Sequence, residues 1–310
     1  MSLPIPSGTR DVLPDELREV RAITDAIRAV FDRYGYGEVA TPALEYEATL
    51  TRGDSAAADP AYRLFDEHGN VLVLRSDMTI PIARVVATRY PNEPTPLRFF
   101  YVQSAYRAVR QHRGQPREIL QAGIELVGSP GPDGTAEAIA VLCAALDAVG
   151  LAGYRIGIGD ASLFARVLER HGIGGDVRER ALAELDARDF VGLERELTGA
   201  GAPRELLRLA TTRGGADVLA ELPEAQTLRE LHALLADDVA GRVIYDLGLL
   251  RSLGYYTGVV FEIYDAAFGE PLGGGGRYDD LLGRFGRELP ACGWALDVER
   301  VHAARLEEGR

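Results

Sequence analysis

The sequence predicts an α+β fold in which helices flank an antiparallel sheet. The predicted strands are separated irregularly, by hairpin turns in some places and by helices in others, whereas a doubly wound parallel sheet requires regular alternation. The chain has 310 residues, of which 46% are hydrophobic. That length accommodates a large domain with a smaller one and a hydrophobic core.

The first half of the chain is expected to alternate helices with short strands. Residues 15–34 carry apolar side chains at intervals of three and four, which predicts a helix. His68-Gly69-Asn70 is a turn signal between two strand-like runs. The elements expected up to residue 150 are a helix over 15–34, a strand within 34–45, a hairpin over 63–75, a helix over 78–90, strands over 97–108 and 119–128, and a helix over 134–150.

From residue 160 to 240 the pattern changes to amphipathic helices separated by glycine and proline. We interpret this segment as a helical insertion that divides a core into a first part, 1–159, and a second part, 241–310. Strands resume after 241. The stretch LRSLGYYTGVVFEIY, 250–264, is interpreted as a strand that places Tyr255 and Tyr256 on opposite faces.

Charge and composition exclude several classes of function. The net charge is −13 and no basic cluster is present, which argues against nucleic-acid binding. All 34 basic residues are arginine, so a Walker-type lysine and a Schiff-base lysine are excluded. Cys143 and Cys292 are too few and too far apart for a disulfide framework or a zinc site, and no metal is expected. Neither a signal peptide nor a membrane span is recognisable, so we expect a cytoplasmic protein.

Two stretches combine polar groups with strand-like patterning. Asp77 and Thr79 lie at a strand-to-helix transition, where they could cap the helix or contact a ligand. Gln121 and Glu125 are four residues apart on a predicted strand, so an amide and a carboxylate share one face.

Two further stretches suggest close approach to a ligand. Arg251 with Tyr255 and Tyr256 could line a polar pocket, although tyrosines often serve only packing. The run GGGGRYD includes Gly274 and Gly275, which allow a sharp turn or close backbone contact with a ligand.

Taken in order, six motifs resemble those of the histidyl-tRNA synthetase catalytic core. They are GTRDVLPDE, LRSDMT, YR followed by QAGIE, RSLGYYTGVVFE, GGGGRYD and GWALDVER. The resemblance covers nearly the whole chain. It implies a class II aminoacyl-tRNA synthetase-like sheet ringed by helices, a dimer, and a helical insertion after the second class motif.

The resemblance also implies a binding pocket for histidine. Asp77 would stand where the family has a glutamate facing the substrate amino group, and Arg251 would bind the substrate carboxylate. The residues implied to bind histidine are Asp77, Thr79, Gln121, Glu125, Arg251, Tyr255 and Tyr256. The family's phosphate-binding arginines correspond to Arg107 and Arg300, which we expect to be vestigial.

Departures from the family pattern concentrate on the ATP side. Val109 replaces a glutamate of the second motif, and Gln115 replaces a loop arginine. Gly254 replaces an acidic residue, and Asp297 brings negative charge to the expected position of the triphosphate. The synthetase's C-terminal anticodon-binding domain is expected to be missing, and no tRNA partner is expected.

This combination resembles a paralogous family, the regulatory subunits of ATP phosphoribosyltransferase. The resemblance implies a protein without catalytic residues or a cofactor, which binds histidine. It would form a homodimer within a hetero-oligomer that contains the short-form catalytic subunit, act in the first step of histidine biosynthesis, and be required for activity and histidine feedback. Two alternatives stay open: a synthetase core that forms histidyl-adenylate, or a free-standing histidine-activating ligase. Either would require ATP and magnesium.

Overall fold

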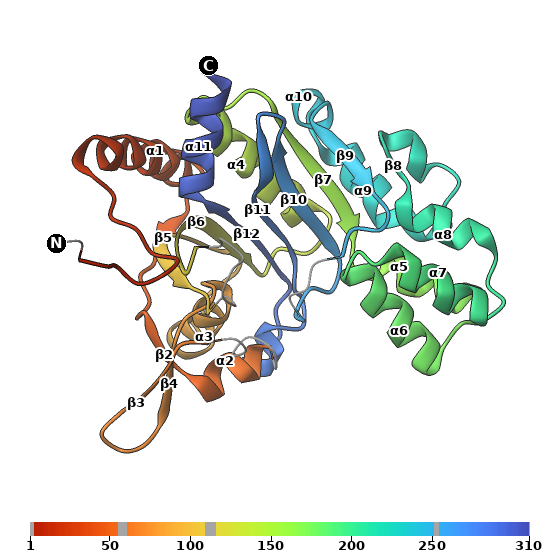
Figure 1. Cartoon of the computed structure of the whole chain (residues 1–310), viewed down its shortest axis with the longest axis horizontal. Coiled ribbons are helices and arrows are strands. Elements are labelled where there is room, and N and C mark those ends of the chain that lie inside the picture. The colour runs from red at the N-terminus through yellow and green to blue at the C-terminus, as the bar shows by residue number, and fades with distance from the viewer. Residues whose placement is uncertain (1–2, 55–60, 109–115, 251–253, 310) are drawn as a thin grey trace.

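The structure is a computed structural model that describes residues 3–54, 61–108, 116–250 and 254–309. Neighbouring strands of its central sheet run antiparallel except for two parallel pairs, at one edge and near the other (Figure 1). The expected α+β fold is therefore confirmed. In spatial order the strands are β1 (Gly37–Glu38), β5 (Leu97–Tyr106), β6 (Glu118–Val127), β12 (Ala291–Asp297), β11 (Phe268–Arg277), β10 (Val259–Asp265), β7 (Tyr154–Asp160), β9 (Val243–Asp246) and β8 (Arg213–Gly214).

Three helices cover one face of this sheet: α1 (Pro14–Arg33), α4 (Asp133–Ala148) and α11 (Val298–Glu308). Proline at the start of α1, acidic residues in its first turn and Arg33 in its last turn all favour the helix. Its apolar stripe ends in Phe31, whose ring lies 5.1 Å from Phe100 and 5.6 Å from Trp294. Burying such a side chain contributes about 1.5–3 kcal/mol, so this contact fixes α1 on the sheet.

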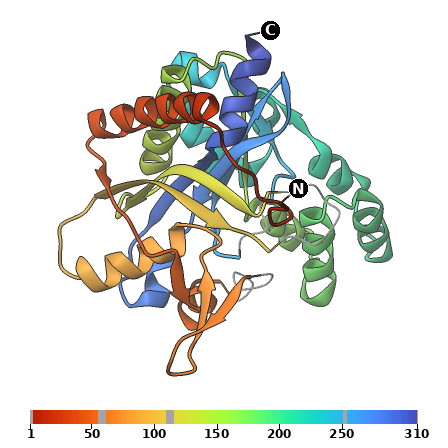
Figure 2. The same ribbon diagram turned by 60° about the vertical axis from the view of Figure 1, so that its left-hand side comes forward.

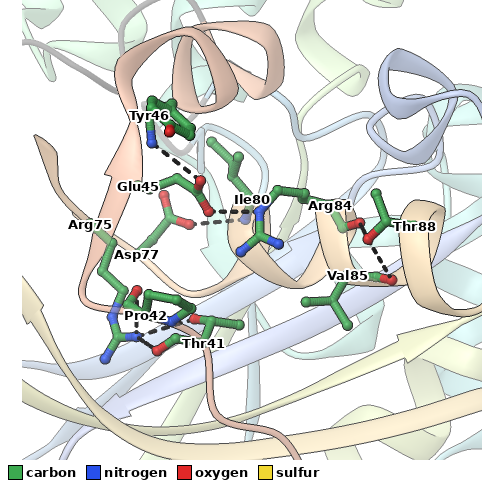
Figure 3. Close-up of polar contacts among 10 residues, drawn as sticks. All are labelled: Thr41, Pro42, Glu45, Tyr46, Arg75, Asp77, Ile80, Arg84, Val85 and Thr88. Atoms are coloured by element: carbon green, nitrogen blue, oxygen red, sulfur yellow. Dashed lines mark hydrogen bonds and ion pairs between the residues drawn. The ribbon is translucent and has the colours of Figure 1, made fainter. Parts of the chain in front are cut away.

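A smaller unit lies at the other end of the molecule (Figures 1 and 2). It contains a three-stranded sheet in the order β2 (Leu44–Tyr46), β4 (Val71–Leu74), β3 (Arg63–Phe65), together with α2 (Glu47–Gly53) and α3 (Thr79–Arg89). The expected hairpin over 63–75 is thus formed. Arg84 of α3 pairs with the buried Glu45 of β2 at 2.7 Å, and Arg75 donates to Thr41 (Figure 3). Arg75 also donates to the carbonyl of Ser104 in β5 at 2.9 Å, which joins the small unit to the main sheet just before α3.

The first part of the segment 160–240 is helical, and its second part contains a short strand, two 3-10 turns and two further helices. Helices α5 (Leu163–Arg170), α6 (Gly175–Asp186), α7 (Phe190–Gly199) and α8 (Arg204–Thr211) form a lobe at the right of Figure 1. The chain then returns to the central sheet as β8. After the 3-10 turns η1 (Ala216–Leu219) and η2 (Pro223–Ala225) come α9 (Gln226–Leu234) and α10 (Asp237–Ala240). Leu228 and Leu231 of α9 belong to the main core.

The stretch 250–264 differs from the sequence-based prediction. β10 begins only at Val259, whereas Gly254 and Tyr255 lie in a turn. Backbone groups before the strand bond outside the strand pairing: the Gly254 N–H donates to Oδ2 of Asp54, at the end of α2, at 3.0 Å, and the Thr257 N–H donates to the carbonyl of Arg277, the last residue of β11, at 2.9 Å. The prediction that Tyr255 and Tyr256 occupy opposite faces of a strand is therefore wrong.

No helix among the described residues is both long enough and apolar enough to cross a membrane.

Candidate functional site

A cavity of about 160 Å³ lies on the sheet face opposite α1 and α4, between β6, β12, β11 and the turn that precedes β10. The two adjacent tyrosines enter it together, with ring centroids 5.0 Å apart. The structure brings most of the predicted site residues to this cavity. Those that line it are Asp77, Thr79, Arg107, Gln121, Tyr255, Tyr256, Gly274 and Arg300.

Glu125 lies beneath the cavity floor and is only 1% exposed. One carboxylate oxygen accepts a hydrogen bond from Thr79 Oγ1 at 2.8 Å, and the other accepts from the Tyr278 hydroxyl. Burial raises the pKa of Glu125 to about 8, although both hydrogen bonds oppose the shift. Space for this carboxyl group depends on Gly293 of β12, because a Cβ there would lie 2.0 Å from Glu125 Oε2.

Asp77 both accepts a hydrogen bond in the first turn of α3 and lines the cavity. Its Oδ1 accepts a hydrogen bond from the Ile80 N–H at 3.2 Å, in the first turn of α3 (Figure 3). The same carboxyl group lines the cavity, and burial raises its pKa, with Arg107 acting in the opposite direction. Two acidic side chains in poorly solvated positions favour a ligand that carries positive charge or N–H donors.

Gln121 offers the clearest unmet hydrogen-bonding capacity of the cavity. Its Oε1 is buried and has no hydrogen-bond partner among the described residues. A buried polar atom in this state costs free energy unless a ligand or water satisfies it. The spacing of Gln121 and Glu125 on one strand therefore brings an amide acceptor and a carboxyl group to the same site, as the sequence suggests.

Two predicted residues lie elsewhere. Gly275 does not line the cavity: a Cβ there would lie 2.1 Å from the carbonyl oxygen of Gly293, so this glycine serves close packing of β11 on β12. Arg251 falls outside the described residues. Tyr278 was missed by sequence reasoning, although it lies two residues after the glycine run, within the GGGGRYD motif that could have pointed to it.

On the expected ATP side, Arg300 is already engaged. Its guanidinium pairs with Glu270 at 2.8 Å and with Asp297 at 3.2 Å, and it donates to the carbonyl of Pro271 at 2.7 Å. Asp297 also accepts from the N–H groups of Glu299 and Arg300, which caps the N-terminus of α11. A helix N-terminus and an arginine are the groups that bind phosphate. Both face carboxylates here, so this arrangement does not fit a triphosphate.

No group of three or more histidine, cysteine and acidic side chains within the described ranges is arranged to hold a metal ion.

Comparisons with known proteins give consistent matches over nearly the full chain. A family model described as histidyl-tRNA synthetase matches residues 8–301. The ATP phosphoribosyltransferase regulatory subunit of Symbiobacterium thermophilum is 41% identical over 98% of this chain and 80% of its own length. A corresponding protein of Moorella thermoacetica is 38% identical over 99% of this chain and 83% of its own length.

Among solved structures, one from Bacillus halodurans is described as an ATP phosphoribosyltransferase regulatory subunit/histidyl-tRNA synthetase. It has a TM-score of 0.90 at 32% identity and covers 98% of this chain and 83% of its own.

Proposed function

The chain belongs to the histidyl-tRNA synthetase-like family of ATP phosphoribosyltransferase regulatory subunits in histidine biosynthesis, and from this premise we propose that its cavity binds histidine without activating it. Two properties of the cavity together support binding: its floor is buried and rich in hydrogen-bond acceptors, and its volume is small. At about 160 Å³ the cavity is below the roughly 300–1,000 Å³ of sites for drug-sized ligands. A single amino acid matches it better than an aminoacyl-adenylate.

This cavity contains hydrogen-bond acceptors for the N–H groups of the ligand. Asp77 supplies a carboxyl group and Gln121 supplies an amide oxygen without a partner in the described structure, and the carboxyl group of Glu125 lies beneath them, bonded to Thr79. An ammonium and an imidazole, both present in histidine, can use these acceptors. Tyr255 and Tyr256 supply ring faces and edges beside them. The family's arginine for the substrate carboxylate corresponds to Arg251.

The contacts of Arg300 with Glu270 and Asp297 support a regulatory rather than a catalytic role. Adenylate formation depends on stabilising the triphosphate charge. With the arginine already neutralised, we expect no histidine-dependent exchange of labelled pyrophosphate into ATP. Clear exchange by the folded protein would instead favour the synthetase core or the free-standing ligase.

Calorimetric titration with histidine tests the binding proposal. Glu125→Ala removes a buried partner of the ligand and is expected to weaken binding by about 2–5 kcal/mol, as for other broken buried charge pairs. Glu118→Ala alters an exposed glutamate at the start of the same strand and is the matched control. Equal affinity of both variants and the parent protein would place histidine binding elsewhere.

A regulatory subunit works with a catalytic phosphoribosyltransferase subunit. We infer that the assembly contains a homodimer of this chain and the short-form catalytic subunit, in the cytoplasm. Support for self-association comes from the outward face of the small sheet, where neighbouring strands in register expose apolar side chains. Leu44, Tyr46 and Leu64 are exposed, and Leu72 and Leu74 of β4 are half-buried beside them on the same face. Exposed apolar patches of this kind mark protein contact sites.

A further inference from the structure

A second and larger cavity lies between the central sheet and the helical lobe. Its volume is about 670 Å³, and strands β7, β8, β9 and β10 contribute to it along with the turn after α6. Glu262 of β10 lines both this cavity and the amino-acid cavity, so the two are neighbours on one face of the sheet. The size is within the range of sites for nucleotide-sized ligands.

Three arginines reach this cavity from three separate elements. Arg155 belongs to β7, Arg213 to β8, and Arg188 to the turn between α6 and α7. Arg188 and Arg213 share Asp246, with N–O distances of 3.5 Å and 2.8 Å. Among the residues that the structure describes, Arg155 has no acidic partner, and its guanidinium donates only to the carbonyl of Tyr154. The carboxyl groups of Asp186, Asp246, Glu262 and Asp265 also line the cavity, so its lining as a whole has no excess of positive charge, and an anion would be held by direct bidentate contacts with the guanidinium groups.

Arg188 adopts a backbone conformation that is unfavourable for residues other than glycine. Its φ is +57°, and no other non-glycine residue in the described ranges has a positive φ. The Arg188 N–H donates to the carbonyl of Leu185 and the Asp189 N–H to that of Glu184, the helix-ending geometry in which glycine is usual. A strained conformation that the surroundings maintain points to a use for the side chain. That side chain bridges the helical lobe to Asp246 of the sheet.

The floor of the cavity is apolar and partly uncovered. Tyr264 of β10 and Ile244 of β9 keep exposed fractions of 38% and 39%, and Leu250 lies beside them. Gly157, between their strands, adds no side chain to the floor. Three further carboxyl groups flank this surface: Glu262, which accepts from the Tyr264 hydroxyl, Asp186 at the end of α6, and Asp265 at the end of β10.

We propose that this cavity binds a phosphorylated ligand of nucleotide size. The phosphate lies against Arg155, Arg188 and Arg213, which suit bidentate contacts to its oxygens. Glu262 and Asp186 accept hydrogen bonds from sugar hydroxyls, the role that acidic residues play toward ribose in other nucleotide sites. A base covers the exposed ring of Tyr264. This inference is independent of the proposed histidine site.

Calorimetry with three probes tests the ligand class: inorganic phosphate, ribose 5-phosphate and AMP. Each successive probe adds a group for which the cavity has a partner, so affinity is expected to rise in that order. Equal affinities for all three would overturn the nucleotide assignment, and failure of all three to bind would overturn the site.

Variants then locate the binding. Arg188→Gly removes the guanidinium while giving the turn the residue that its backbone favours, so the protein is expected to stay folded and to bind AMP at least about tenfold more weakly. Arg155→Ala is expected to have a similar effect. Arg180→Ala, on the same helix as Asp186 but in an exposed pair with Glu196, is the matched control and should leave AMP binding unchanged.

One further variant distinguishes binding in this cavity from binding at the expected ATP side of the amino-acid cavity, where Arg300 lies. AMP binding that is lost in Arg300→Ala but retained in Arg188→Gly would overturn the proposal. Histidine titrations of Arg155→Ala and Arg188→Gly are expected to match those of the parent protein, so failure at one cavity can be told apart from failure at the other.

Discussion

The carboxyl group of Glu125 is buried, and its burial makes the stability of the folded protein depend on pH. In the unfolded chain the group ionises near its ordinary pKa of 4.5, whereas in the folded protein burial raises that pKa to about 8. A raised folded-state pKa stabilises the protein fully below pH 4.5, and this stabilisation is lost as the pH rises through 8. A cation bound beside Glu125 would offset the loss by favouring the ionised form.

Histidine binding is therefore expected to depend on pH. Near pH 7 the ligand's ammonium is charged and its imidazole is mostly neutral, while Glu125 is largely protonated in the free protein and becomes half ionised only near pH 8. Forming the carboxylate–cation contact must release a proton, so affinity should rise toward pH 8, by up to about tenfold per pH unit. Calorimetry in buffers of different ionisation enthalpy measures the release directly.

Glu125→Gln supplies the control for this prediction, because an amide of the same shape cannot titrate. Its affinity for histidine should be lower and nearly constant over the same range. A parent protein whose affinity is also constant, with no proton released, would show that histidine does not contact an ionised Glu125.

At the level of single residues, the sequence predicts which side chains share a face of one strand better than it predicts which side chains of different strands are in contact. The Gln121–Glu125 spacing is a local property of β6; Gln121 lines the cavity, and Glu125 lies beneath it, bonded to Thr79. Tyr278 directly follows β11, and Gly293 belongs to β12. Both lie close to Glu125 because of the register between strands, which no local sequence pattern specifies. Gly275 was misplaced for the same reason, because its neighbour is Gly293 rather than a ligand.

At the level of elements, helices and the hairpin were predictable and the start of β10 was not. Apolar periodicity located α1 and α4 to within a few residues. The segment before β10 has the composition of a strand, yet its backbone bonds to Asp54 and Arg277 outside any ladder. Tertiary contacts override local preference here, as they often do for β-formers. This deviation brings both tyrosines into one cavity.

The small sheet provides a prediction about self-association. Leu64 of β3 is 44% exposed on its apolar outward face, whereas Phe65, 75% exposed, lies on the opposite face of the same strand. Leu64→Asp is expected to weaken the homodimer by about tenfold or more, because the substitution occurs twice in a two-fold interface and removes apolar burial. Sedimentation velocity over a concentration series measures this.

Phe65→Asp is the matched control, since it removes a larger exposed side chain from the other face. It should leave the association constant unchanged. If Phe65→Asp dissociates the dimer and Leu64→Asp does not, the interface uses the opposite face. If neither has an effect, the small sheet is not the interface.

For the whole molecule, one sheet face carries both candidate binding cavities, and Glu262 lines each of them. The segment 160–240, interpreted from the sequence as a helical insertion, contains α5 to α8. The sequence could not show that β8, only two residues long, returns to pair with β9, or that α9 joins the core. Such short pairings depend on the packing of distant segments. The second cavity exists because of that return, so local patterns could not reveal it.

The arrangement finally predicts how histidine would act on the assembly. If histidine bound to this chain changes its affinity for the catalytic subunit, then the catalytic subunit must change the affinity for histidine by the same factor, typically about 5- to 150-fold. We expect this equality when both constants are measured, by calorimetry for histidine and by an association assay for the two subunits. Glu125→Ala should abolish the effect of histidine on assembly and on feedback, whereas Glu118→Ala should preserve both. A Glu125→Ala complex that histidine still inhibits as strongly as the parent complex would mean that the sensing site is not the cavity above Glu125, even if histidine binds there.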